Sequence, residues 1–230
     1  MESRIINNCR IFSFPSKEIF LSSIENEKKV LVAMNAEKIL KKDTKLKVII
    51  NNNIGYADGV GAVMALKQKG LDAIKIPGSE FWLDIVNRFY KLKSFYIVGS
   101  SQKVIDRTIE KLNNDFPAIN IVGYRNGYLK DGEKEQLKSD IVEKKPDIVF
   151  VAQGTPAQEY LMNDLMDVHK ALYMGLGGSF DVYTGYKKRA PKFYLDFHLE
   201  WFYRLLKEPT RISRQYILVK FLILLKMRML

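Results

Sequence analysis

Short apolar segments rich in β-branched residues alternate along this chain with longer segments of helical periodicity. Near-continuous apolar strands separated by helices are typical of a parallel sheet that is covered on both faces. The expected strands are Val30–Met34, Leu46–Ile50, Phe95–Val98, Ile119–Val122, Ile148–Val151 and Leu172–Met174. The expected helices are Gly59–Lys69, Glu80–Leu92, Gln102–Asp115, Glu133–Lys144 and Ala157–Val168. The sequence therefore predicts an α/β fold with a Rossmann-like, mostly parallel sheet and helices on both of its faces.

Several kinds of chemistry are excluded by the residue types. Cys9 is the only cysteine, which excludes an internal disulfide framework and a cysteine-based metal cluster. The two histidines, His169 and His198, are too few and too far apart for a zinc cluster. The chain contains neither a P-loop motif nor an Asp-x-Asp motif. We therefore expect no bound metal and no P-loop ATP chemistry.

The positive charge of the chain is concentrated at its C-terminal end. Residues 187–230 contain eleven basic and three acidic side chains, which accounts for +8 of the total net charge of +11. This segment would therefore be the part of the chain that binds an anionic partner. The alternative is a basic helix face that is simply solvated.

Two helical segments are expected within this basic region, at about 192–206 and 210–230, separated by Pro209. The second places apolar residues three and four apart at Ile212, Tyr216, Val219, Ile223 and Met227. A basic amphipathic helix with this composition is typical of a membrane-surface element. The alternative is a helix packed on the domain or on a second subunit, so self-association stays open. We expect an α/β domain over residues 1–190 and a helical, membrane-proximal appendage over 191–230.

No segment of the sequence is suited to crossing a membrane. There is no run of about 18 uncharged apolar residues. Residues 1–20 carry charged side chains among the apolar ones, unlike a signal peptide. The expectation is a soluble chain, or one that lies on a membrane surface.

Polar and glycine-rich clusters follow five of the apolar segments, where ligands bind in open α/β sheets. They are 35–37, 57–61, 99–101, 153–158 and 175–181. Glycine-rich turns that open helices can present backbone N–H groups to phosphate, although such turns also use glycine for steric reasons. Five clusters at one sheet edge favour a nucleotide or phosphorylated ligand. The residues expected to contact it are Gly99, Gly154, Gly177, Gly178 and Asp181.

Asp58 is the acid with the most suggestive position. It is flanked by Ala57 and Gly59 and precedes an expected helix. A carboxylate held there could accept a proton from a sugar hydroxyl during a displacement. The alternative is that Asp58 caps the helix Gly59–Lys69.

Taken together, these segments resemble the WecG/TagA/CpsF family of bacterial glycosyltransferases from about Val30 to Tyr216. The matching motifs occur in the order that the family has. The most specific are Gly175-Leu-Gly-Gly-Ser-Phe-Asp181, Arg189-Ala-Pro191 and Leu199-Glu-Trp-Phe-Tyr-Arg-Leu-Leu206 with Glu208-Pro209, Arg211 and Arg214. The others are Asn35-Ala-Glu37, Ala57-Asp-Gly-Val-Gly61, Gly78-Ser-Glu80, Ile97-Val-Gly99, Phe116-Pro117, Ile121-Val-Gly123, Asn126-Gly-Tyr128, Pro146-Asp147 and Gly154-Thr-Pro-Ala-Gln-Glu159.

This resemblance implies an inverting, metal-independent transfer of a sugar from a UDP-sugar, which is a substrate, so no cofactor is expected. The sugar is often of the N-acetylmannosamine type, and the acceptor is a sugar on undecaprenyl diphosphate, used for a surface polysaccharide. The protein would then act in the cytoplasm, peripherally on the inner face of the bacterial cell membrane. The resemblance assigns the base to Asp58, pocket residues to Asn35 and Gln158, and contacts with the acceptor diphosphate to Arg204, Arg211 and Arg214.

Three positions depart from the family pattern. Ala33 stands where many members have Thr, which removes a hydroxyl from the site. Lys75 stands where an Arg is usual, which keeps the charge in the substrate-binding pocket but loses the bidentate geometry. Glu80 replaces an Asp. These changes affect the identity of the donor sugar and leave the reaction class unchanged.

Two other functions remain compatible with single features. A nicotinamide-dependent oxidoreductase would explain the glycine turns, but Met64 stands where the dinucleotide fingerprint requires Gly or Ala. A nucleic-acid-binding protein would explain the basic segment, but its Leu, Ile and Phe content suits lipid better than a phosphate backbone. We therefore expect no nucleic acid among the partners.

Overall fold

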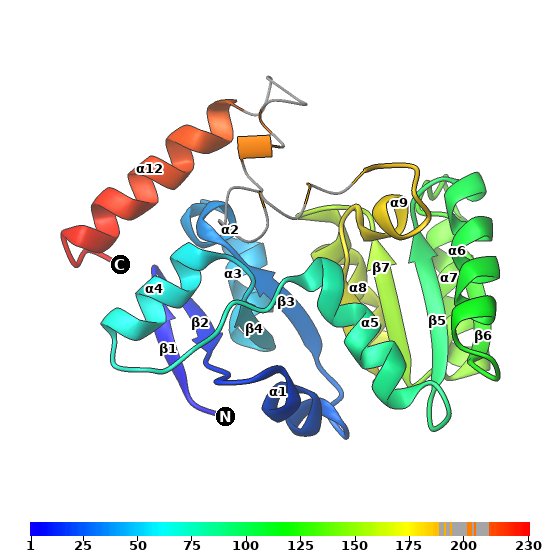
Figure 1. The fold of residues 1–230 in the computed structure, drawn as a ribbon. Coiled ribbons are helices and arrows are strands. Elements are labelled where there is room, and N and C mark those ends of the chain that lie inside the picture. Colours follow the sequence, from blue (N-terminus) through cyan, green and yellow to red (C-terminus); the bar gives the residue numbers. More distant parts are fainter. Residues whose placement is uncertain (189–190, 192–193, 195–201, 204, 206–211) are drawn as a thin grey trace.

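The computed structural model describes residues 1–188, 191, 194, 202–203, 205 and 212–230. Within this part, eight strands form one sheet in the order β1-β2-β4-β3-β8-β7-β5-β6 (Figure 1). All neighbouring strands are parallel except β1, which is antiparallel to β2. The strands are β1 (Ser3–Ile6), β2 (Cys9–Phe12), β3 (Val30–Met34), β4 (Ile54–Ala57), β5 (Ser94–Gly99), β6 (Asn120–Arg125), β7 (Ile148–Ala152) and β8 (Leu172–Gly175). The predicted α/β class and the mostly parallel sheet are confirmed.

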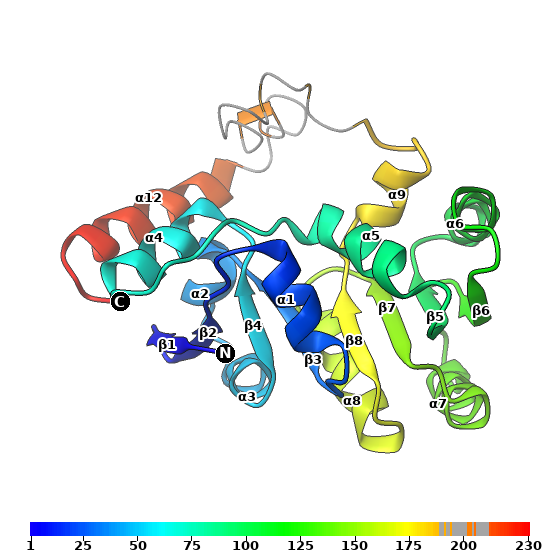
Figure 2. The ribbon, with the colours of Figure 1, turned by 60° about the horizontal axis from the view of Figure 1, so that its bottom comes forward.

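Helices cover both faces of the sheet, as Figure 2 shows. One face packs against α2 (Ala36–Leu40), α3 (Thr44–Asn51), α4 (Val60–Gln68), α7 (Glu133–Lys144) and α8 (Ala157–Val168), and α12 (Ile212–Lys226) packs in turn on α2 and α4. The other face packs against α1 (Lys17–Ile24), α5 (Gly78–Phe89), α6 (Gln102–Asp115) and α9 (Ser179–Tyr183). The chain thus forms three layers.

The alternation of side chains along each strand supplies the two cores. In β3, Val30, Val32 and Met34 face one layer of helices, whereas Leu31 faces the other. The same alternation occurs in β5 and β7, which explains why these strands are apolar at nearly every position.

One predicted strand, Leu46–Ile50, is wrong, because this segment is helix α3. The Asp43 side chain caps the helix by accepting from Leu46 N at 2.9 Å. Leu46, Ile49 and Ile50 are buried on one face while Val48 is 55% exposed, which is helical periodicity. The β-branched run suggested a strand, but capping and the 3.6-residue period favour the helix. The strand lies just beyond it, at β4, where all four residues are buried.

The first two strands were not predicted from the sequence. They form a hairpin whose two turn residues, Asn7 and Asn8, have φ values of 47° and 63°. Asparagine tolerates positive φ better than most residues, and such tight turns suit the twist of a hairpin. β2 then pairs with β4, so the hairpin extends the sheet at one edge.

Helix α12 packs on α2 and α4, beside which both views place it (Figures 1 and 2). Phe221 and Leu225 are buried in this contact. A Cβ on Gly61 would lie 2.9 Å from the Phe221 ring, so α4 needs glycine there. The predicted stripe faces away: Tyr216, Val219, Ile223 and Met227 are each more than half exposed.

The rest of the predicted C-terminal region is described only in part. The side chain of Ile212, the first residue of the stripe, and most of the predicted helix at 192–206 lie outside the described residues. Among the described helices, none is long and apolar enough to cross a membrane.

Candidate functional site

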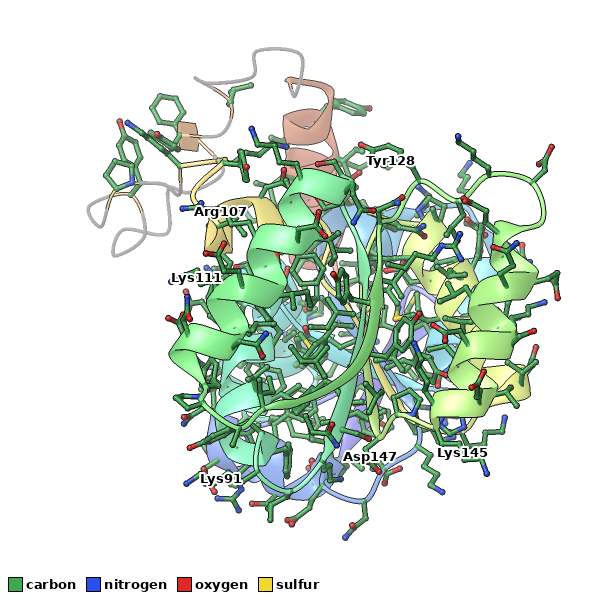
Figure 3. All side chains as sticks on the ribbon, turned by 90° about the vertical axis from the view of Figure 1, so that its right-hand side faces the viewer. Lys91, Arg107, Lys111, Tyr128, Lys145 and Asp147 are labelled. Carbon is green, nitrogen blue, oxygen red and sulfur yellow. The ribbon has the colours of Figure 1, made fainter. Side chains whose placement is uncertain are left out.

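The five predicted clusters lie at one edge of the sheet, because each follows a parallel strand. They come after β3, β4, β5, β7 and β8. Figure 3 shows this direction: Tyr128, which follows β6, lies at one end of the molecule. Asp147 and Lys91, which precede β7 and β5, lie at the opposite end. The carboxyl edge of the sheet is thus the candidate site.

The chain reverses its winding direction between two neighbouring strands, β5 and β7. Helix α6, which follows β5, packs on one face of the sheet, and α8, which follows β7, packs on the other. Loops that depart in opposite directions leave a crevice between them, where ligands bind in open α/β sheets. Gly99, the last residue of β5, and Gly154, in the loop after β7, lie at this point.

Asp58 follows β4 and points its carboxylate at the start of α5. Its Oδ1 accepts a hydrogen bond from Gly78 N at 2.7 Å. The N-cap position of helix α4 is Gly59, which has no side chain to cap the helix, and the hydrogen bond of Asp58 described above is with α5. The carboxylate lies at the positive end of α5, which stabilises its charge and fixes its direction.

Asn35 lies beside this turn. It is the N-cap of α2, and its Oδ1 accepts from Lys38 N at 3.0 Å. A Cβ on Gly59 would lie 3.3 Å from Asn35 Cβ, so the turns after β3 and β4 are in contact. The amide Nδ2 of Asn35 is the group that this cap leaves available as a donor to a ligand.

Gln158 links two of the glycine-containing loops. Its Oε1 accepts from Gly154 N at 3.2 Å and from Gly177 N at 2.9 Å. Its Nε2 donates to Glu159 Oε1 at 3.2 Å, and the side chain is buried. Two backbone N–H groups that were expected to face phosphate therefore face Gln158. In this arrangement, Gln158 shapes the site through the loops that it joins.

A buried ion pair that the sequence analysis did not identify lies behind Gln158. Lys38 Nζ is 2.7 Å from Glu159 Oε1, and these side chains are 6% and 1% exposed. Thr155 Oγ1 donates to the same oxygen at 3.1 Å. Within the described part of the chain, Glu159 Oε2 has no hydrogen-bond partner. The pair ties α2, which begins beside Asn35, to α8.

Asp181 reaches from α9 to the loop after β5. Ser100 Oγ donates to Asp181 Oδ2 at 3.2 Å. Ser100 O also accepts from Gly127 N at 2.8 Å, and Gln153 Nε2 donates to Gly127 O at 2.6 Å. The loops after β5, β6, β7 and β8 are therefore joined in one network.

Steric crowding explains why a glycine occupies position 99 in this network. Its φ is +143°, and an added Cβ would lie 2.5 Å from Ala152 O. Glycine is required there by the close approach of β5 and β7. At Gly154, Gly177 and Gly178, by contrast, an added Cβ would meet no described atom within 4 Å. These three glycines border open space.

Lys75 lies in the segment between α4 and α5. Its neighbour Ile76 donates from its backbone N to Ala57 O at 2.8 Å, so this segment runs beside the turn that carries Asp58. The Lys75 side chain is half-buried. The structure thus brings Lys75, Asp58 and Asn35 to the same part of the edge.

A surface hollow of about 370 Å³ lies between α6 and α9 and is lined in part by Arg107, Lys111 and Tyr183. Figure 3 shows Arg107 and Lys111 along the outer side of α6. Neither Asp58 nor Gln158 lines this hollow. It is therefore distinct from the edge at which the predicted residues gather.

Arg204 and Arg211 lie outside the described residues. The backbone of Arg214 lies in α12, but its side chain is likewise outside the described part. The described residues contain no group of three or more His, Cys, Asp or Glu side chains that could hold a metal ion.

The sequence profile of the glycosyl transferase WecG/TagA/CpsF family matches residues 9–230. This match covers nearly the whole chain, including every segment that contributes to the carboxyl edge. It agrees with the resemblance found in the separate motifs. The chain therefore belongs to the WecG/TagA/CpsF family and is a glycosyltransferase of surface-polysaccharide biosynthesis, with a sugar donor and an acceptor as its substrates.

Proposed function

We propose that the protein transfers a sugar from a UDP-sugar to a sugar acceptor on a polyprenyl diphosphate, with inversion at the anomeric carbon. The donor sugar would be of the N-acetylmannosamine type, its uronic acid or another hexose. The observation that carries this proposal is the Asp58 carboxylate, anchored by Gly78 N at 2.7 Å beside the Asn35 turn. It is an oriented carboxylate at the edge where a nucleotide-linked ligand would bind.

In the proposed step, Asp58 accepts the proton of the acceptor hydroxyl as that oxygen attacks the anomeric carbon. The bond from the anomeric carbon to the UDP oxygen breaks, and its electron pair leaves with UDP. A carboxylate is a weak base, so orientation and stabilisation of the leaving group must supply most of the acceleration.

The leaving diphosphate would be stabilised without a metal. The chain has no Asp-x-Asp motif to hold a divalent cation against it. Lys75, whose backbone neighbour bonds to the turn of Asp58, would supply a cation for it. The open space that the described residues leave at Gly154, Gly177 and Gly178 would give room for the diphosphate near the backbone. Asn35 would contact the donor through its amide.

The acceptor diphosphate would be bound by Arg204, Arg211 and Arg214 of the C-terminal appendage. This proposal rests on the family motif and on the +8 charge of residues 187–230. Charge reversal at Arg211 and Arg214 should therefore reduce transfer more than reversal at Lys226 and Arg228, which would contact only lipid. Equal losses from the two pairs would contradict a specific role for the arginines.

The appendage, residues 191–230, would also hold the enzyme on the inner face of the cell membrane. The exposed apolar side chains of α12, with Lys220 and Lys226 on the same helix, support this proposal. Apolar side chains can enter the lipid boundary while basic residues attract an anionic leaflet, at about 1 kcal/mol each. The α/β unit over residues 1–190 would then carry the donor site.

Incubation of the protein and a polyprenyl-diphosphate-linked acceptor with a panel of UDP-sugars, followed by mass spectrometry, tests the proposal. A product heavier by one sugar, formed with release of UDP, is the expected result. No product with any UDP-sugar would contradict it. Binding of a nicotinamide cofactor, or of nucleic acid with a steep salt dependence, would instead support one of the two other functions.

A further inference from the structure

Tyr56, in β4, carries a buried hydroxyl that bonds to none of the described residues. The residue is fully buried among aromatic side chains, with its ring centroid 5.1 Å from that of Phe20 and 6.0 Å from that of Phe81. Its hydroxyl has no hydrogen-bond partner among the described residues. An unsatisfied buried polar group destabilises a protein, and a phenylalanine would fill the same space without that cost. Packing alone therefore does not explain a tyrosine here.

The position of the hydroxyl points to the candidate base. A Cβ on Gly78 would lie 2.8 Å from the Tyr56 oxygen, so the hydroxyl lies directly against Gly78. Gly78 N is the donor to Asp58 Oδ1 at 2.7 Å. The hydroxyl and the carboxylate thus meet at the same glycine, one against its Cα and the other at its N–H.

Two further observations agree with this position. Ala33 is the register partner of Tyr56 in β3, and its Cβ would lie 3.5 Å from a Cβ on Gly78. The small Ala33 side chain therefore lies close to Gly78, on the same side as the Tyr56 hydroxyl. Burial raises the pKa of Tyr56, and the Asp58 carboxylate raises it further. The Tyr56 phenol therefore keeps its proton and can donate a hydrogen bond, and the Asp58 carboxylate is a charged acceptor near it.

We infer that Tyr56 is a positioning residue for Asp58: the Tyr56 hydroxyl becomes a further anchor of the Asp58 carboxylate, in addition to Gly78 N, when the substrates are bound. This inference rests on the proposed role of Asp58. Two donors would hold the carboxylate in the direction of the acceptor hydroxyl. The buried hydroxyl, which has no partner among the described residues, is then a stability cost that is offset in the working complex.

The variant Tyr56→Phe removes only the oxygen. Its urea midpoint should be equal to or higher than that of the wild type, because an unsatisfied group is lost. Its kcat should fall about tenfold while KM for the UDP-sugar changes less than about twofold, because the donor site is intact. Wild-type kcat in this variant would overturn the inference.

Tyr173→Phe is the matched control. Tyr173 is also a fully buried sheet tyrosine, but its hydroxyl donates to His169 O at 2.9 Å, at the amino end of β8. Its removal takes this bond away from the carbonyl, so the urea midpoint should fall and kcat should stay unchanged. Tyr56→Phe should thus lower kcat without lowering stability, whereas Tyr173→Phe should lower stability without lowering kcat. A kcat loss in Tyr173→Phe equal to that of Tyr56→Phe would show a general structural effect and contradict the inference.

A double-mutant cycle separates this inference from the proposed function. If Tyr56 acts through Asp58, Tyr56→Phe should cause no further loss of kcat in an Asp58→Asn background. A second tenfold loss there would overturn the inference and leave Asp58 as the base. Full activity of Asp58→Asn alone would overturn the proposed base itself, and the role of Tyr56 with it.

Discussion

Lys38 and Glu159 are 121 residues apart in the sequence, yet Lys38 Nζ lies 2.7 Å from Glu159 Oε1 with both side chains buried. The pair joins the helix that Asn35 caps to the helix that contains Gln158. It therefore connects the part of the carboxyl edge that follows β3 to the part that follows β7. Gln158, which bonds to Glu159 and to two loop N–H groups, extends this connection to Gly154 and Gly177.

Removing one partner of this ion pair should be costly. Glu159→Gln leaves the Lys38 ammonium buried without its counter-charge, which should lower the free energy of unfolding by about 3 kcal/mol or more. The double variant Lys38→Met/Glu159→Gln has no buried charge and should recover much of that loss. Urea denaturation at pH 7 measures both.

The exposed pair Lys138–Glu135 is the control for this experiment. Glu135→Gln should hardly change stability, because water screens the interaction. An equally small effect of Glu159→Gln would show that the Lys38–Glu159 pair does not hold the edge together.

Much of the fold could be predicted from the sequence because strands and helices here have clear periods. The strands β3, β5, β7 and β8 are apolar at nearly every position, and α6 has the predicted bounds Gln102–Asp115. The hairpin β1–β2 was missed because its strands have only four residues each, which gives too short a pattern. The helix at 44–51 was misassigned because its β-branched residues resemble a strand.

The site was predictable in its position but not in its contacts. Glycine and polar residues after apolar segments marked the carboxyl edge, and the structure gathers Asn35, Asp58 and Lys75 there. The hydrogen-bond partners depend on tertiary distances that the sequence does not contain. For this reason the sequence revealed neither the Lys38–Glu159 pair nor the bonds that occupy Gln158. The Tyr56 hydroxyl, which has no partner among the described residues, could likewise be found only from the packing around it.

The exposed stripe of α12 should bind lipid. In the variant Val219→Asp/Ile223→Asp, each changed side chain is 54% exposed, so the free energy of unfolding should change by less than about 0.5 kcal/mol per residue. The affinity for vesicles that contain anionic lipid should fall about tenfold or more, because two apolar groups become anionic. Vesicle co-sedimentation measures this loss.

Val142→Asp is the matched control, because Val142 is 44% exposed on α7. It should bind vesicles as the wild type does. Unchanged vesicle binding by the α12 variant would indicate that the stripe serves self-association, which sedimentation velocity would reveal.

The cap of α3 should give the protein a pH-dependent increment of stability. The hydrogen bond from Tyr160 and the one from Leu46 N lower the pKa of Asp43 below its ordinary value of 3.8. A lowered pKa in the folded state means that the increment is complete above that ordinary value and is lost as the pH falls through the folded-state pKa. Asp43→Ala should therefore cost about 1 kcal/mol at pH 7 and progressively less below pH 4. Urea unfolding of both proteins across this range tests the prediction, and a cost independent of pH would contradict it.

Transfer should survive chelation of divalent cations. The sequence has no Asp-x-Asp motif, and the described residues contain no cluster of three or more metal-ligating side chains. Product formation in EDTA should equal that in its absence. Complete loss of transfer in EDTA with recovery on addition of Mn²⁺ would point to a metal-dependent mechanism.

The most direct test of the proposed mechanism is the turnover of Asp58→Asn on the lipid-linked acceptor. Asparagine retains an oxygen that can accept from Gly78 N, so the turn and the start of α5 should stay in place and stability should hardly change. The base is lost, so turnover should fall by about 100-fold or more. A folded Asp58→Asn protein with turnover close to that of the wild type would contradict the assignment of Asp58 as the base and leave it with a structural role at α5.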